Sequence, residues 1–116
     1  MIIDIINDYR KDHGKQPIHN WNKVENDFCE AHCLAMANAK QIFHAPGHFL
    51  GDRSEAVAVC SFGSDFNSTA YYLIFSVLNG SEPHRNILLN SNSLAYGVLV
   101  NDNAMYLTIR GLPYVI

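Results

Sequence analysis

Three polar residues occupy positions that a purely structural role explains poorly. His44 follows an apolar stretch, Glu55 opens a strand-like run that is otherwise apolar, and His84 follows a proline at the start of a helical segment. A carboxylate at the edge of an apolar strand loses hydration and needs a partner to stay ionised, and imidazole is a natural partner. Two imidazoles and one carboxylate are also a common ligand set for zinc and other first-row metals. The three residues are therefore candidate metal ligands, provided that the fold brings them together.

Each candidate also has a plainer structural explanation, which the sequence leaves open. His84 can hydrogen-bond a backbone carbonyl near a helix start, and His44 can be a solvated loop residue. Glu55 can form an ion pair with Arg53 or Arg85. In that case the three residues need not meet at all.

The spacing Ser81-x-x-His84 invites a further interpretation, with Ser81 as a nucleophile. Ser81 is better explained as the N-cap of a helix that begins at Glu82-Pro83, because serine is favoured at the cap and proline in the first turn. We therefore predict no catalytic residue.

The composition limits the classes of function. The chain has 116 residues, of which 48% are apolar and 16% charged, with a net charge of −3. This length predicts one domain over residues 1–116. A basic stripe is missing, which argues against nucleic acid as a partner, and no apolar run approaches the ~18 residues of a membrane span. The first residues lack the basic and apolar regions of a signal peptide.

The three cysteines are Cys29, Cys33 and Cys60, and an odd number cannot form a fully paired disulfide framework. Cys29 and Cys33 lie on one face of a predicted helix, where the directions of their side chains do not converge for a disulfide. We predict that all three are small buried hydrophobic residues. Metal binding by Cys29, His32 and Cys33 is the alternative, but it lacks a second Cys/His pair at a zinc-finger spacing.

Hydrophobic periodicity places these residues on a predicted set of helices and strands. A first helix covers residues 2–11, and a second helix of about five turns begins after Asn22 and ends before Pro46. The apolar stripe of the second helix consists of Val24, Phe28, Ala31, Ala35, Ala39 and Ile42. The other predicted elements are a strand over 55–62, a helix capped by Asp65 or Asn67, a short helical segment over 81–88, and a hairpin of strands 94–100 and 104–110. We predict an α+β fold, an α/β/α sandwich with a small antiparallel sheet of about three strands.

Several segments, in the same order along the chain, resemble motifs of the CAP superfamily, the cysteine-rich secretory and pathogenesis-related proteins. The most specific is His84-Arg85-Asn86-Ile87-Leu88, which resembles the family's His-Arg-x-x-Ile-Leu with a single residue, Asn86, between the arginine and the isoleucine. The other matches are Asn7-Asp8-Tyr9-Arg10 with Gly14, Pro17 and Ile18, then Phe43-His44, Ser54-Glu55-Ala56 and Tyr96-Gly97-Val98. The resemblance is to the short bacterial members, also called SCP-like.

This resemblance implies the family's sandwich fold and a cleft where two histidines and acidic residues converge on a divalent metal, often zinc. The matching metal-site positions are His44, Glu55 and His84, with Ser81 and Glu82 beside them in the same cleft. Ser81 stands where the fuller family pattern has a second glutamate, and Glu82 would point about 100° away from it on a helix. The resemblance also implies an extracellular or cell-surface location and a small molecule, a lipid or a protein as partner.

Three functions follow from these observations. The leading hypothesis is a non-enzymatic SCP-like module whose His/Glu cleft takes a divalent metal. The alternative is a metal-dependent hydrolase that activates water, with Glu55 as ligand or general base and His84 as an orienting group. In a third interpretation the polar cluster is only a hydrogen-bond network that organises a partner-binding scaffold.

Overall fold

A computed structural model describes residues 1–19 and 21–113 of the chain. The helices are α1 (Ile2–Asp12), α2 (Lys23–Ala39), α3 (Gly47–Leu50), α4 (Phe66–Tyr72) and α5 (Glu82–Asn90). The strands are β1 (Ser54–Ser61), β2 (Leu94–Asn101) and β3 (Ala104–Gly111). A π-helical segment over Leu73–Val77 and a 3-10 turn over Leu78–Gly80 continue α4 towards α5.

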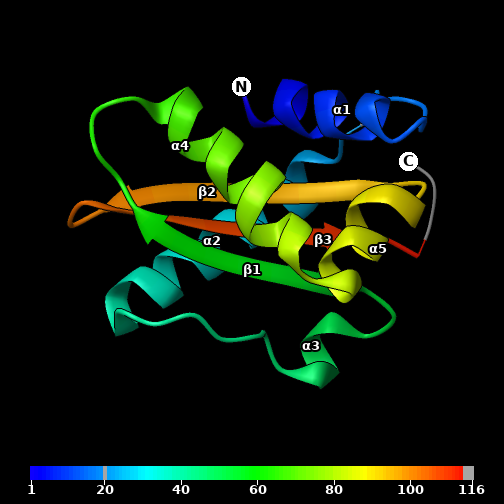
Figure 1. Ribbon diagram of the computed structural model, residues 1–116. Coiled ribbons are helices and arrows are strands. Elements are labelled where there is room, and N and C mark those ends of the chain that lie inside the picture. Colours follow the sequence, from blue (N-terminus) through cyan, green and yellow to red (C-terminus); the bar gives the residue numbers. More distant parts are fainter. Residues whose placement is uncertain (20, 114–116) are drawn as a thin grey trace.

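The strands form an antiparallel sheet in the order β1-β3-β2, so β3 lies in the middle. Asp102 and Asn103 join β2 to β3 with positive φ angles of 52° and 61°, which residues of this type adopt in tight hairpin turns. Helix α2 covers one face of the sheet, and α1, α4 and α5 cover the other (Figure 1). The predicted α+β fold, with its sandwich and its hairpin, is therefore confirmed.

The alternation of side chains divides each strand between two packed faces. On one face, Ala56 and Ala58 join Leu107 and Ile109 in a core that also includes residues of α1 and the α4 segment. On the other face, Val57 packs with residues of β3 and α2. Because both faces are covered, β1 is apolar from Ala56 to Cys60, as the two-faced apolar pattern predicts.

Helix α2 packs on the sheet with a different face from the one that its apolar stripe indicates. Val24 is 60% and Phe28 45% exposed, and Ala31, Ala35 and Ala39 also face solvent. The buried residues of α2 are Glu25, Cys29, Cys33, Met36 and Ala37. The stripe was misleading because small and sulfur-containing side chains allow α2 to approach the sheet closely. A Cβ at Gly97 of β2 would overlap the α2 backbone at Cys29 and Glu30.

The ends of the helices follow the predicted signals in part. The side chain of Asn22 accepts a hydrogen bond from Glu25 N, and Asp65, rather than Asn67, caps α4. Helix α2 ends at Ala39 because Lys40 adopts a left-handed conformation with a φ of 56°. None of the helices found over residues 1–19 and 21–113 has the length and hydrophobicity that a membrane-spanning helix requires.

The three cysteines are free thiols, and two of them are fully buried. Burial raises the pKa of Cys29 to about 12 and that of Cys33 to about 11, so both remain protonated at neutral pH. The prediction is confirmed for these two and is wrong in part for Cys60, which is only half-buried in β1.

Candidate functional site

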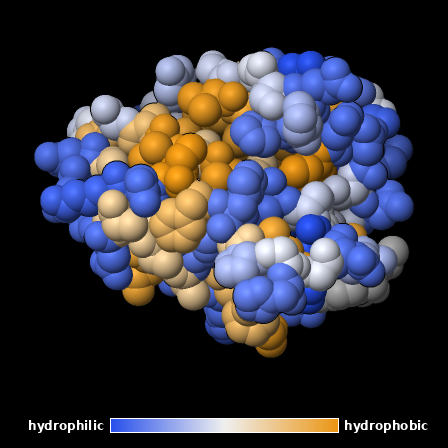
Figure 2. Space-filling view, turned by 90° about the horizontal axis from the view of Figure 1, so that it is seen from below, coloured by the Kyte–Doolittle hydropathy of each residue, from blue (hydrophilic) through white to orange (hydrophobic). Residues whose placement is uncertain are grey.

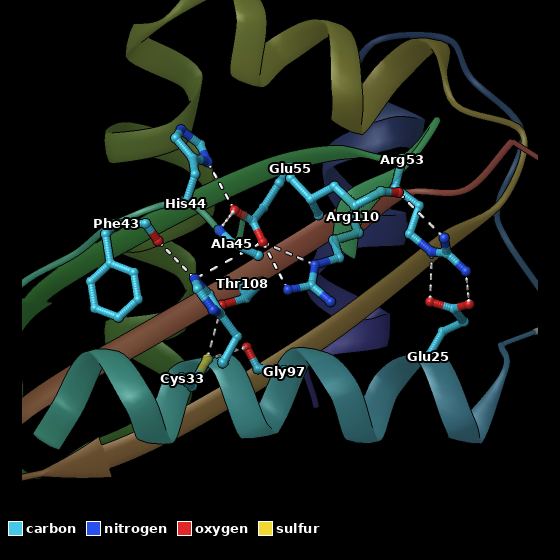
Figure 3. A network of polar contacts seen from close by, with 12 residues as sticks. Glu25, Cys33, Phe43, His44, Ala45, Arg53, Glu55, Gly97, Thr108 and Arg110 are labelled. Carbon is cyan, nitrogen blue, oxygen red and sulfur yellow. Dashed lines mark hydrogen bonds and ion pairs between the residues drawn. The ribbon is translucent and has the colours of Figure 1, made fainter. Parts of the chain in front are cut away.

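The first part of the site is a buried ion pair between neighbouring strands. Glu55 of β1 lies directly opposite Arg110 of β3 in the antiparallel register. Both side chains are 1% exposed, and both Nε and Nη2 of Arg110 lie 2.9 Å from Oε2 of Glu55 (Figure 3). A bidentate guanidinium compensates the charge of a carboxylate that water cannot reach.

The other carboxylate oxygen positions the loop that follows α2. Oε1 of Glu55 accepts hydrogen bonds from His44 Nδ1, at 2.9 Å, and from Ala45 N, at 3.0 Å (Figure 3). With Arg110 on Oε2, four donors occupy the acceptor positions of the carboxylate. In the neutral form of the ring, donation from His44 Nδ1 to Glu55 leaves the lone pair on Nε2, and the side chain is 60% exposed. The site thus presents an oriented imidazole to solvent.

These contacts keep Glu55 ionised. Burial by itself raises the pKa of Glu55. The hydrogen bonds from Ala45 N, His44 and Arg110, together with the positive charge of Arg110, lower this pKa by a larger amount. The net pKa lies below the ordinary value of 4.5. A carboxyl group with a lowered pKa is a weak base, so Glu55 is suited to holding its neighbours in place rather than to accepting a proton.

We expect this lowered pKa to shape the acid stability of the protein. The stabilisation from Glu55 is complete above the unfolded-state pKa of about 4.3 and is lost as the pH falls through the lower folded-state pKa. Glu55→Gln removes the titrating group, so its melting temperature should fall less steeply below pH 4.5 than that of the parent protein. Thermal unfolding from pH 6 to pH 3 measures this. The control Asp27→Asn, at an exposed i,i+4 ion pair with Lys23, should keep the parent slope; equal slopes for Glu55→Gln and the parent would contradict the assignment.

His84 lies near His44 but is not bonded to it. It is the third residue of α5 and is half-buried, and its Nδ1 is buried without a hydrogen-bond partner in the part of the chain that the structure describes. Burial lowers the pKa of His84, and the nearby charge of His44 lowers it further. His84 is therefore a neutral imidazole at pH 7, and the described residues do not fix its tautomer.

The remaining predicted cleft residues, Ser81 and Glu82, make no hydrogen bond or ion pair with this cluster within the described residues. Ser81 stands at the N-cap position of α5, as predicted, but its side chain forms no capping hydrogen bond. Glu82 is exposed in the first turn of α5. Among the described residues, neither forms a hydrogen bond or ion pair with His44, Glu55 or His84, so their place in a common cleft stays a prediction.

The predicted ion pairs of Glu55 with Arg53 or Arg85 are wrong. Arg53 pairs instead with Glu25 of α2, and Arg85 donates to the backbone oxygen of Asn79. The actual partner, Arg110, was not among the candidates, because its role depends on the register between β1 and β3. The signal available in the sequence was an arginine at the end of a predicted apolar strand.

His32 is a second neighbour that the sequence analysis did not connect with Glu55. Its Nε2 lies 2.7 Å from the backbone oxygen of Phe43 and 4.0 Å from Oε2 of Glu55. The Cys33 thiol contacts the backbone oxygen of Gly97 and the hydroxyl of Thr108. Among the described residues, no group of three His, Cys, Asp or Glu side chains is arranged to hold a metal ion. The three-ligand set of His44, Glu55 and His84 thus stays a prediction.

The fold is shared with solved structures of SCP-domain proteins. An extracellular protein containing an SCP domain from Bacillus anthracis superposes with a TM-score of 0.61 at 22% identity, over 93% of this chain and 38% of that one. NaASP2, solved with Zn²⁺, gives 0.62 at 12% identity, over 97% of this chain and 77% of that one. A cysteine-rich secretory protein from Staphylococcus aureus gives 0.52 at 14% identity, over 96% and 37%.

At these sequence identities the similarity shows only that the fold is shared. It confirms the predicted resemblance to CAP proteins as far as the fold is concerned. The chain has the fold of an SCP, or CAP, domain, and it spans 38% of the length of the Bacillus protein. No family model matches the chain, and no curated protein matches it by sequence.

Proposed function

We propose that this SCP-fold domain is a non-enzymatic binding module that takes a divalent metal, zinc in the first place, between His44 and His84. The observation that carries the proposal is the state of the two imidazoles. His44 is oriented by Glu55 so that its Nε2 lone pair is free, and the lowered pKa of His84 keeps that ring neutral. Neutral imidazole is the form that binds metal ions.

The two histidines fit a metal site in which Glu55 positions a ligand instead of binding the metal itself. The acceptor positions of its carboxylate are already occupied by Arg110, His44 and Ala45 N. Binding a metal through Glu55 would break at least one of these bonds and leave a buried donor unsatisfied. A carboxylate that fixes the ring of a ligating histidine is a common arrangement around metal sites, so we assign Glu55 as a positioning residue.

A hydrolase is not favoured by the same geometry. That alternative gives Glu55 the role of ligand or general base, yet the carboxylate is buried, fully hydrogen-bonded and of lowered pKa. A bound cation would instead supply a fixed positive charge that ties the loop of His44 to α5.

The proposal extends to location and partners. The extracellular SCP protein among the structural neighbours supports a role outside the cell. The partner would be a small molecule, a lipid or another protein that recognises the metal-bound surface.

A thermal-shift titration tests metal binding. Zinc added to metal-free protein should raise the melting temperature, because a ligand of the folded state at 100 times its Kd adds ~2.7 kcal/mol of stability. The variant His44→Ala/His84→Ala should lose the shift. The matched control is His19→Ala/His48→Ala, which removes two exposed histidines and should keep it.

The double variant retains all three cysteines, so any shift that comes from zinc on thiols would remain in it. A shift that is equal in the parent protein and His44→Ala/His84→Ala would therefore contradict the site. No shift in the parent protein would favour the third interpretation, a hydrogen-bond network that only organises the surface.

A further inference from the structure

An apolar groove lies between α2 and the loop that carries α3, on the α2 side of the sheet. It encloses about 350 Å³, within the ~300–1,000 Å³ of small-molecule sites. Its walls include Phe28, Ala35, Pro46 and Phe49, and Arg110 also lines it. Figure 2, which views the molecule from the side of α2 and α3, shows apolar surface gathered on this face and bordered by polar residues. The exposed apolar residues of α2 therefore form one wall of this groove.

Arg110 brings an unused hydrogen-bond donor to this groove. Its Nε and Nη2 both bind Glu55, and Nη1 is buried without a partner among residues 1–19 and 21–113. In a guanidinium held side-on in this way, the N–H groups of Nη1 point away from the carboxylate. A buried charged donor without an acceptor is uncommon, and it indicates that an acceptor is supplied from outside the chain.

Two aromatic rings define the shape of the groove. Phe28 and Phe49 meet edge to face with ring centroids 5.7 Å apart, although both are nearly half exposed. The ring of Phe49 also lies over the guanidinium of Arg110, with 5.5 Å from Cζ to the ring centroid. Nη1 of Arg110 is buried in this arrangement, so a ligand reaches it only when the ring of Phe49, in the four-residue helix α3, moves aside.

We propose that this groove binds a small aromatic carboxylate, with its ring packed against Phe28 and Phe49 and its carboxylate on Nη1 of Arg110. An anionic acceptor suits this donor. The negative charge of Glu55 is shared among His44, Ala45 N and Arg110, so Glu55 neutralises only part of the positive charge of the guanidinium. Charge-assisted hydrogen bonds are about twice as strong as neutral ones, so a carboxylate is preferred to an alcohol. The groove shares Arg110 and Ala45 with the cluster around Glu55, but it needs no metal.

The probe is 2-naphthylacetate, compared with 2-(2-naphthyl)ethanol, which has the same ring and nearly the same length but no charge. Calorimetric titration should show the acid binding at least about tenfold more tightly than the alcohol. In a ¹⁵N-labelled sample the acid should shift the amide signals of α2 and of the Ala45–Leu50 loop. Equal affinity for acid and alcohol, or shifts centred on His84, would overturn the proposal.

A matched pair of variants on one face of α2 locates the site without touching the ion pair. Ala35→Trp places a ring in the groove and should weaken binding of the acid more than about tenfold. Ala39→Trp makes the same change one turn further along α2, outside the lining of the groove, and should bind as the parent does. Unchanged binding by Ala35→Trp would also overturn the proposal.

Discussion

Replacing Arg110 by methionine is expected to lower the free energy of unfolding by about 3–5 kcal/mol, because it leaves Glu55 as an unpaired charge inside the protein. Both side chains are 1% exposed, so water cannot replace the guanidinium. The loop that carries His44 should also become more mobile, because Glu55 would take up a proton and no longer fix the imidazole of His44. Urea unfolding of the parent and the variant measures the change.

The double variant Glu55→Gln/Arg110→Met provides the control. It removes both charges and should recover much of the stability, because a buried ion pair can often be replaced by neutral side chains at little cost. If Arg110→Met fails to fold, folding of the double variant still tests the argument. A loss below about 1 kcal/mol in Arg110→Met would show that the pair does not organise the site.

The second large effect is expected at Gly97, where α2 crosses β2. Gly97→Ala should destabilise the protein by about 3 kcal/mol or more and lower its melting temperature by about 10 °C, because a methyl group there overlaps the backbone of α2. A backbone cannot move aside as a flexible side chain can. Scanning calorimetry of the variant gives the shift directly.

Gly111→Ala is the matched comparison in the same sheet. An added Cβ at Gly111 would meet the hydroxyls of Ser54 and Ser91, and these side chains can rotate away. Its effect should be clearly smaller than that of Gly97→Ala. Equal effects would mean that α2 does not pack as closely on β2 as the structure has it.

Much of the fold could be predicted because local patterns and tertiary packing agree. The turn residues Asn101-Asp102-Asn103 between two apolar runs predict a hairpin, and the structure contains both of its strands, β2 and β3. The two-faced apolar pattern of β1 indicated a sheet covered on both sides. The caps at Asn22 and Asp65 are local hydrogen bonds, which the sequence within a few residues determines.

The packing face of α2 could not be predicted from hydrophobicity. Its largest apolar residues, such as Phe28, are exposed beside the groove, and Cys29, Cys33 and Ala37 pack on the sheet. The close approach at Gly97 selects small side chains on the helix, and this constraint comes from a residue about 65 positions away in the chain. The exposed stripe does not join the core, and three of its residues, Phe28, Ala31 and Ala35, line the groove instead.

The contact between His44 and Glu55 follows from the need of a strand-edge carboxylate for a partner, and the structure contains it. The metal site of His44, Glu55 and His84 that the resemblance to CAP proteins implies stays a prediction. Arg110 depends on strand register, and the contact of His32 with Phe43 depends on the path of the loop after α2. Neither long-range feature has a local signature.

The most direct test of the proposed function is an anomalous-scattering map from crystals soaked in zinc. We expect a peak shared by the imidazoles of His44 and His84, with the carboxylate of Glu55 still bound to Arg110 and to His44 Nδ1. A peak elsewhere, or one in which Glu55 has left Arg110 to bind the metal, would contradict the assignment of the two histidines as ligands and of Glu55 as the residue that positions them.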